Sequence, residues 1–263
     1  MTWIQAIIIA IVEGITEFLP ISSTGHMIIT SSIMGIEKND FVKLYEVCIQ
    51  LGAILSVVVL YWRKFFDFSR LNFYLKLIIA FIPAAIFGAL FAKKIDALLE
   101  SPMTVAWAFI IGGIVLLFID KVFNRLSIDR MEDVSFPKSF FIGCFQVLAM
   151  IPGVSRSAAT IVGGMQQKLT RRLAAEFSFF LAVPTMMAAT AKKLWDFKKQ
   201  GFHFDAQQLP MLLVGNIIAF IVAMIAIRTF IQYLQRNDFR VFGVYRIIAG
   251  LAILAMIWAS VIV

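Results

Sequence analysis

The sequence predicts an all-α polytopic membrane protein, and three observations support this fold class. Of the 263 residues, 61% are hydrophobic and only 15% are charged, and the mean hydropathy is +0.89. A soluble domain of this length needs a surface with roughly 25% charged residues. The apolar residues also form long blocks, such as 44–62 with one charge and 104–119 with none. Blocks of about 18–20 residues match a hydrocarbon core of about 30 Å.

Two kinds of apolar segment follow one another along the chain. Two stretches, 3–35 and 138–168, are each broken by a polar turn that contains proline, "FLPISSTGH" in the first and "MIPGVSRSAAT" in the second. Each apolar piece has about 12–16 residues and is too short to cross, so both stretches are predicted to be re-entrant helical hairpins. Such irregular backbone is tolerated only against protein or a water-filled cavity, so it already indicates a site. The predicted full spans are 42–62, 72–92, 104–122, 173–194, 210–230 and 241–261.

The two halves of the chain have the same order of elements. Pro20 and Pro152 lie 132 residues apart, and each hairpin is followed by three spans. We therefore interpret 1–263 as one membrane domain, with a first repeat at 1–122 and a second repeat at 123–263. Because each half has an odd number of spans, the second half is inverted. In such an inverted-topology repeat the two hairpin tips meet near the midplane.

The formal net charge of +8 is assigned to loops, because no Lys/Arg run with interleaved aromatics suggests a nucleic-acid site outside them. Loops on one side hold fourteen Lys and Arg residues and loops on the other side hold eight. The positive-inside rule puts the first side in the cytoplasm and both termini outside. The N-terminus has no basic region or cleavage site, so it is not interpreted as a removed signal peptide. Cys48 and Cys144 are expected to be small buried hydrophobes.

The first hairpin places acids and a histidine in an apolar segment, "EGITEFLPISSTGH". Glu13 and Glu17 are four residues apart and share a helix face. A charge at membrane depth costs at least about 2.5–3.5 kcal/mol, so a cation, a metal or a shared proton must offset the pair. Pro20 ends one helix, and a Ser or Thr caps the next, whose free N–H groups near His26 form an anion site. Solvated acids near an interface and purely structural capping are the alternatives.

The second turn, "PGVSRSAAT", adds an arginine to the same arrangement. Arg156 is the only basic residue between Lys138 and Lys168, and an ionised guanidinium in this place needs an anionic partner. The partner is either Glu13 or Glu17 in a structural ion pair, or a phosphate held by the arginine, the serine hydroxyls and helix-end amides. Acids, histidine, hydroxyls and arginine together are the set expected for phosphoryl transfer.

The two motifs resemble the signature regions of the bacterial undecaprenyl-diphosphate phosphatase family, also known for bacitracin resistance. The resemblance extends to the length, the hydropathy and the stretch "RRLAAEFSFFLAVPTMMA", so it covers essentially the whole chain. It implies an integral membrane enzyme that hydrolyses a C55 polyprenyl diphosphate to the monophosphate and so recycles the lipid carrier of cell-wall synthesis. It also implies a location in the bacterial cytoplasmic (inner) membrane, a dependence on Mg²⁺ or Ca²⁺, and a site that faces the periplasm or exterior.

Carried over by position, the resemblance implies a set of site residues. The catalytic residues are Glu17, Ser23, His26 and Arg156, and the metal ligands are Glu13 and Glu17. The substrate-binding residues by this resemblance are Ser22, Ser155, Ser157 and Thr160, and Thr24, a further hydroxyl of the first turn, is predicted with them.

Two alternatives stay open at this point. Ser23 is the expected nucleophile, activated by His26 or Glu17, but a water nucleophile with His26 as general base is the competing mechanism. A lipid-phosphate flippase or secondary transporter is the competing function, because inverted repeats and broken helices are typical of transporters. The expected partners are the polyprenyl diphosphate substrate and membrane lipids, with no nucleic acid, and a homodimer is left open.

Overall fold

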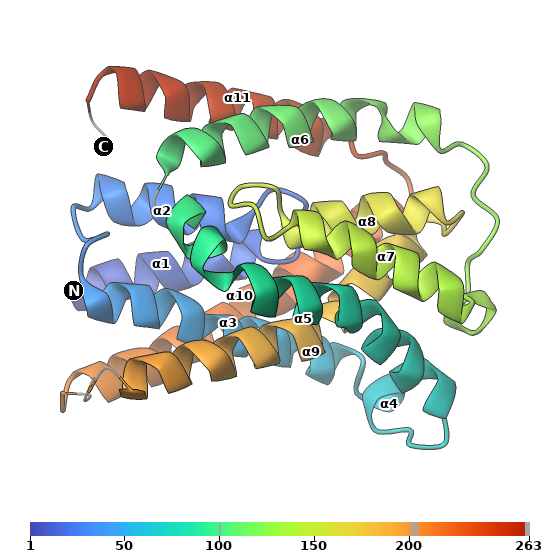
Figure 1. The fold of residues 1–263 in the computed structure, drawn as a ribbon, viewed down its shortest axis with the longest axis horizontal. Coiled ribbons are helices and arrows are strands. Elements are labelled where there is room, and N and C mark those ends of the chain that lie inside the picture. The colour runs from blue at the N-terminus through green and yellow to red at the C-terminus, as the bar shows by residue number, and fades with distance from the viewer. Residues whose placement is uncertain (100, 200, 202–204, 261–263) are drawn as a thin grey trace.

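The computed structural model describes residues 1–99, 101–199, 201 and 205–260, with only the backbone described for 92–99. Within these residues the chain is helical apart from turns and one isolated parallel bridge between Ile128 and Leu169 (Figure 1). The helices in chain order are α1 (Trp3–Thr16), α2 (Ser23–Ile33), α3 (Asp40–Leu60), α4 (Trp62–Phe65), α5 (Leu71–Leu99), α6 (Pro102–Val122), the 3₁₀ turn η1 (Met131–Asp133), α7 (Phe136–Leu148), α8 (Arg156–Gln166), α9 (Arg171–Lys199), α10 (Gln208–Leu234) and α11 (Arg240–Trp258).

Six helices in the described part of the chain are long and apolar enough to cross a membrane, namely α3, α5, α6, α9, α10 and α11. Each predicted span falls on one of them, which confirms the all-α membrane fold class. The clearest differences are that α5 and α9 are both 29 residues long and continue past their apolar blocks. The residues that follow the block of α5, 93–99, are mostly Lys, Ala and Leu, which favour helix regardless of hydropathy.

The two predicted breaks are also present. Residues 17–22 separate α1 from α2, and residues 149–155 separate α7 from α8. Ser22 and Ser155 cap the second helix of each pair through their side chains, and both have a left-handed backbone, with φ of 71° and 74°. This conformation costs a non-glycine residue about 1–3 kcal/mol, and such strain concentrates at functional sites. The re-entrant course of the two pairs and the inverted repeat stay predictions.

Helix α9 is the most buried of the six spanning helices and α11 is the least buried. Of the apolar window of α9, 72% is buried, against 22% for α11, which pairs with α6 along one side of the molecule (Figure 1). The short helices pack on spanning helices, α1 on α10 and α7 on α5. Gly143 allows the second contact, because a Cβ there would lie 2.1 Å from the Ala80 carbonyl oxygen. This close packing fixes the position of the turns that follow α1 and α7.

Candidate functional site

A cavity of about 230 Å³ lies where the two turns meet. Its walls come from both pairs of short helices and from α3 and α9, so residues far apart in sequence face one space. Gln50 on α3 and Thr185 on α9 add polar groups that the sequence analysis did not single out. Six of the ten predicted site residues line it, namely Glu17, Ser22, Ser23, Thr24, Ser155 and Arg156.

Glu17 joins the two halves of the site. Its Oε1 accepts a hydrogen bond from Arg156 Nη2 at 3.0 Å, and this contact is also an ion pair between side chains that are 5% and 13% exposed. Its Oε2 accepts a hydrogen bond from the hydroxyl of Ser23. Of the partners considered for the arginine, the structure therefore contains the ion pair with Glu17. The same carboxylate holds the proton-bearing hydroxyl of the expected nucleophile.

The guanidinium of Arg156 is fixed from several sides. Nη1 donates to the Ser178 carbonyl oxygen at 2.7 Å and to the Ser178 hydroxyl at 3.2 Å. The guanidinium carbon lies 5.8 Å from the centroid of the Phe18 ring. Nε is buried and has no hydrogen-bond partner among the described residues. The arginine thus lines the cavity in one orientation.

Two predicted substrate-binding residues do not line the cavity, and their hydroxyls serve contacts between helices. Ser157 is buried, and its hydroxyl donates to the Leu19 carbonyl oxygen at 2.6 Å and lies 3.0 Å from the Ser155 hydroxyl. Thr160 is also buried, with its hydroxyl 2.7 Å from the Ser178 hydroxyl. These contacts hold the residues that do face the cavity.

His26 also lies outside the cavity lining and is half-buried on α2. Its Nδ1 lies 2.8 Å from the Ser22 carbonyl oxygen, and its Nε2 lies 2.6 Å from the Tyr245 hydroxyl on α11. Because a carbonyl only accepts, Nδ1 carries a proton and Nε2 of the neutral ring accepts from the tyrosine. The hydroxyl of Ser23 donates to Glu17 and not to His26. The geometry therefore favours Glu17 over His26 as the group that activates Ser23.

Glu13 is the strongest candidate for a cation ligand. Its side chain is fully buried, and neither carboxylate oxygen has a hydrogen-bond partner among the described residues. The charged groups that act on it are Glu17, Glu46 and Arg156. In the described part of the chain, no three His, Cys, Asp or Glu side chains form a group that could hold a metal on their own. Magnesium, however, needs only one or two carboxylates besides water and substrate phosphates, so the acidic pair fits such an ion.

Arg246 on α11 connects both turns to the rest of the bundle. Its side chain is fully buried and donates to five backbone carbonyl oxygens, at distances from 2.7 to 3.4 Å. Among the described residues no carboxylate lies within ion-pair distance of it. The acceptors are Pro20 in the first turn, Gly153 and Val154 in the second turn, and Ala108 and Phe109 on α6.

Three residues of this region, Arg246, Tyr245 and Ser178, were not predicted from the sequence. Arg246 is the only charged residue in the predicted span 241–261, and that isolation was a usable signal. Ser178 is a hydroxyl between phenylalanines in "EFSFF", which is a weaker signal because serine also occurs in helix contacts. Tyr245 has no signal of its own, because its role depends on the distant His26.

Comparisons with known proteins show the family of the chain. Residues 6–252 match the family model described as bacitracin resistance protein BacA. An undecaprenyl-diphosphatase of Flavobacterium psychrophilum is 61% identical over 254 residues, covering 97% of this chain and 95% of that protein. Undecaprenyl-diphosphatases of Porphyromonas gingivalis and Aquifex aeolicus are 51% and 46% identical, over 99% and 95% of this chain and 99% and 97% of those proteins. The chain therefore belongs to the bacitracin resistance protein BacA family.

Proposed function

We propose that the protein is an integral membrane phosphatase that hydrolyses undecaprenyl diphosphate to undecaprenyl phosphate and inorganic phosphate. This reaction recycles the lipid carrier of cell-wall synthesis and so confers resistance to bacitracin. The observation that supports it most is near full-length identity of 45–61% to undecaprenyl-diphosphatases. The cavity also supports phosphate hydrolysis, because the Arg156 guanidinium, the Glu17 carboxylate and the Ser23 hydroxyl all line it.

The decisive experiment measures phosphate release by the purified protein from undecaprenyl diphosphate in detergent. We expect inorganic phosphate and undecaprenyl monophosphate in equal amounts. A flippase or secondary transporter would release no phosphate while still moving lipid phosphate across reconstituted vesicles. That result would replace the phosphatase by the transporter.

In the proposed reaction, the terminal phosphate binds against Arg156, with the hydroxyls of Ser22, Thr24 and Ser155 as further donors. The Ser23 Oγ attacks the terminal phosphorus as its proton passes to Glu17, the carboxylate that already accepts its hydrogen bond. The bond from this phosphorus to the bridging oxygen breaks, and the lipid monophosphate leaves. Water then cleaves the phosphoserine and releases inorganic phosphate. In the alternative, water attacks directly with His26 as general base.

A Ser23→Ala variant tests the covalent route. We expect kcat to fall by about 10³-fold or more, as when a nucleophile is removed from a catalytic unit. Wild-type protein incubated with terminally labelled substrate and quenched in acid should carry label on Ser23. Ser32→Ala, a matched change on the same helix, should leave kcat unchanged. Full turnover by the Ser23→Ala protein would eliminate the covalent route in favour of the attacking water.

We propose that Glu13 and Glu17 hold a divalent cation, Mg²⁺ or Ca²⁺. The support is the buried, unpartnered carboxylate of Glu13 beside a second acid. When bound, the ion would neutralise negative charge on the phosphate oxygens. Glu17 keeps a second lone pair on each oxygen besides those used by its present partners.

A Glu13→Gln variant tests this assignment. We expect the Mg²⁺ concentration for half-maximal phosphate release to rise by about tenfold or more, because a charged ligand is lost. Asp196→Asn, an exposed carboxylate far along α9, should leave the metal requirement unchanged. An unchanged metal requirement in the Glu13 variant would contradict the assignment.

We also propose that the protein lies in the bacterial inner membrane, with its site open to the exterior. The end of the bundle that carries the loops after α6, α8 and α10, which we call the arginine-rich end, lies in the cytoplasm. Loops after α6, α8 and α10 gather at that end, where Asp120 binds both Arg171 and the Phe239 backbone N–H. In a background without Cys48 and Cys144, an impermeant maleimide on intact spheroplasts should label Lys38→Cys. It should label Arg130→Cys only after lysis. The opposite labelling pattern would reverse the orientation.

A further inference from the structure

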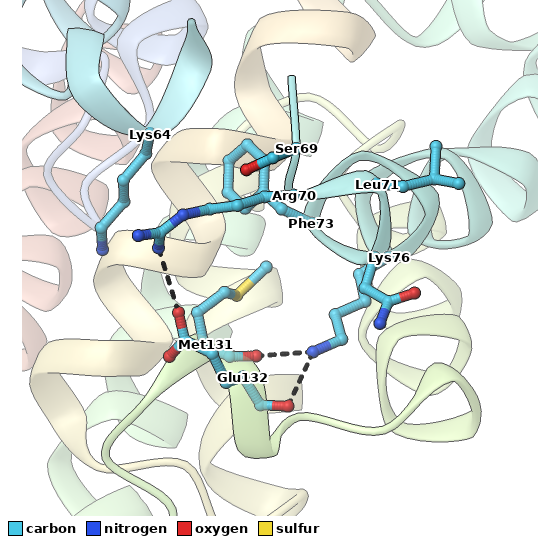
Figure 2. Close-up of a pocket in the computed structure, with 9 residues that line it drawn as sticks. Lys64, Ser69, Arg70, Leu71, Phe73, Lys76, Met131 and Glu132 are labelled. Atoms are coloured by element: carbon cyan, nitrogen blue, oxygen red, sulfur yellow. Dashed lines mark hydrogen bonds and ion pairs between the residues drawn. The ribbon is translucent and has the colours of Figure 1, made fainter. Parts of the chain in front are cut away.

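A second and larger cavity, of about 420 Å³, lies at the arginine-rich end of the bundle (Figure 2). It lies between α4, the start of α5 and the 3₁₀ turn η1, and it is separate from the site described above, with which it shares no lining residue. Its lining residues are Lys64, Ser69, Arg70, Leu71, Asn72, Phe73, Lys76, Met131 and Glu132. We call it the basic end cavity.

The lining of the basic end cavity holds three cations and one carboxylate, Glu132. Among these cations Lys76 is unusual, because its side chain is only 6% exposed and lies on α5, which is long enough to span a membrane. Its ammonium donates to the carbonyl oxygens of Met131 at 2.7 Å and Glu132 at 2.9 Å (Figure 2). Among the described residues no carboxylate lies within 4 Å of it. Carbonyls orient an ammonium but do not neutralise it, so Lys76 forms no direct ion pair and keeps one N–H besides the two that donate to Met131 and Glu132.

The other two cations are paired and still offer donors. Arg70 contacts Asp67 through Nε at 2.7 Å and Glu132 through Nη1 at 3.3 Å, which leaves Nη2 free of these carboxylates. Lys64 lies 3.5 Å from Glu176. The lining residues carry three positive charges and one negative charge, and adding Asp67, Glu176 and the Arg172 that also pairs with Glu176 still leaves one positive charge in excess. An anion is the ligand that this arrangement fits.

The cavity opens onto an apolar surface. Around it, Trp62, Phe66 and Phe68 are 55%, 61% and 76% exposed, as expected for aromatic side chains at the depth of lipid headgroups. From Leu71 at the cavity rim, a stripe of exposed apolar residues continues along one face of α5. Its members, spaced three or four residues apart, are Leu71, Leu75, Ile78, Ile82 and Ile86. A ligand with a charged head and long apolar chains matches both the cavity and the stripe.

We propose that the basic end cavity binds the phosphate headgroup of an anionic phospholipid, whose acyl chains lie along the apolar stripe of α5. The phosphate accepts hydrogen bonds from Lys76 and Arg70 and matches the excess positive charge of the cavity. The stripe distinguishes a lipid from free phosphate, because a free ion would leave those five apolar side chains without a specific partner. The lipid would thereby tie α5 to η1 at the end of the bundle.

The test uses the delipidated full-length protein in detergent, with bound lipid counted by native mass spectrometry. Phosphatidylglycerol should bind at least about fivefold more tightly than phosphatidylcholine, which is what one basic residue contributes at an anionic surface. Arg70→Gln should lower phosphatidylglycerol affinity by about the same factor. Arg130→Gln is the matched control, because Arg130 is exposed at the same end, forms a comparable pair with Asp133, and does not line the cavity.

A second variant keeps the test informative without removing any contact. Asn72→Glu places a carboxylate in the cavity wall and should also weaken phosphatidylglycerol binding, while Asn72→Gln should not. Equal binding of the two lipids, or equal losses in the Arg70 and Arg130 variants, would overturn the proposal. Displacement of phosphatidylglycerol by millimolar inorganic phosphate would overturn it too, because the cavity would then be a site for the free ion.

Discussion

An Arg156→Lys variant is expected to fold and to lose about 10³-fold in kcat for phosphate release, the lower end of what an arginine contributes to phosphoryl transfer. Lysine keeps the positive charge beside Glu17, so the buried ion pair can persist. It cannot reproduce the planar fork that contacts Glu17 and Ser178 together. The loss should therefore appear in the chemical step, with little change in stability.

The matched control is Arg130→Lys, which makes the same substitution at an exposed ion pair. It should leave kcat unchanged. Size-exclusion chromatography and thermal unfolding in detergent should show that both variants are folded. If kcat of Arg156→Lys stayed within tenfold of wild type, the arginine would act only as the counter-charge of Glu17 and not on the phosphate.

Replacing Arg246 with methionine is expected to produce the largest loss of stability. The change leaves the carbonyls of Pro20, Gly153 and Val154 in the buried turns without their donor. An unsatisfied buried acceptor costs about 1–3 kcal/mol, so the free energy of unfolding should fall by at least about 3 kcal/mol. For a domain of this size that corresponds to a Tm lower by roughly 6–12 °C.

Thermal unfolding of purified protein in detergent measures this effect. Arg240→Met, at the exposed start of the same helix, is the matched control and should unfold near the wild-type temperature. Arg246→Lys should be intermediate, because an ammonium supplies three of the five donors. An Arg246→Met protein as stable as the Arg240→Met protein would show that the five hydrogen bonds do not hold the turns.

The features that local chemistry determines could be predicted from the sequence. The break at Pro20 and the capping role of a serine after it depend on neighbouring residues, and both are present, with Ser22 as the cap. The six spans depend on composition over about 20 residues, and they too were found. The charge argument correctly required an anionic partner for Arg156 and named Glu17 as one choice.

What could not be predicted depends on contacts between distant segments. The acceptors of Arg246 are backbone carbonyls, which every residue has, so no side-chain pattern marks them. Likewise, the pairing of His26 with Tyr245 joins residues 219 positions apart. The family resemblance implied that Ser157 and Thr160 bind the substrate, and that stays a prediction. The contacts of their hydroxyls with Leu19 and Ser178 depend on the packing of α8 and could not be predicted from the sequence.

The position of Arg246 near the end of the chain has a consequence for biosynthesis. The residue that locks the two turns together is made 93 positions after Gly153, one of its acceptors. At about 5–20 residues per second, the ribosome needs roughly 5–20 s to cover that distance. During this interval both turns are already in the growing chain but have no common anchor. The two turns therefore gain their common donor only when the last helix is in place.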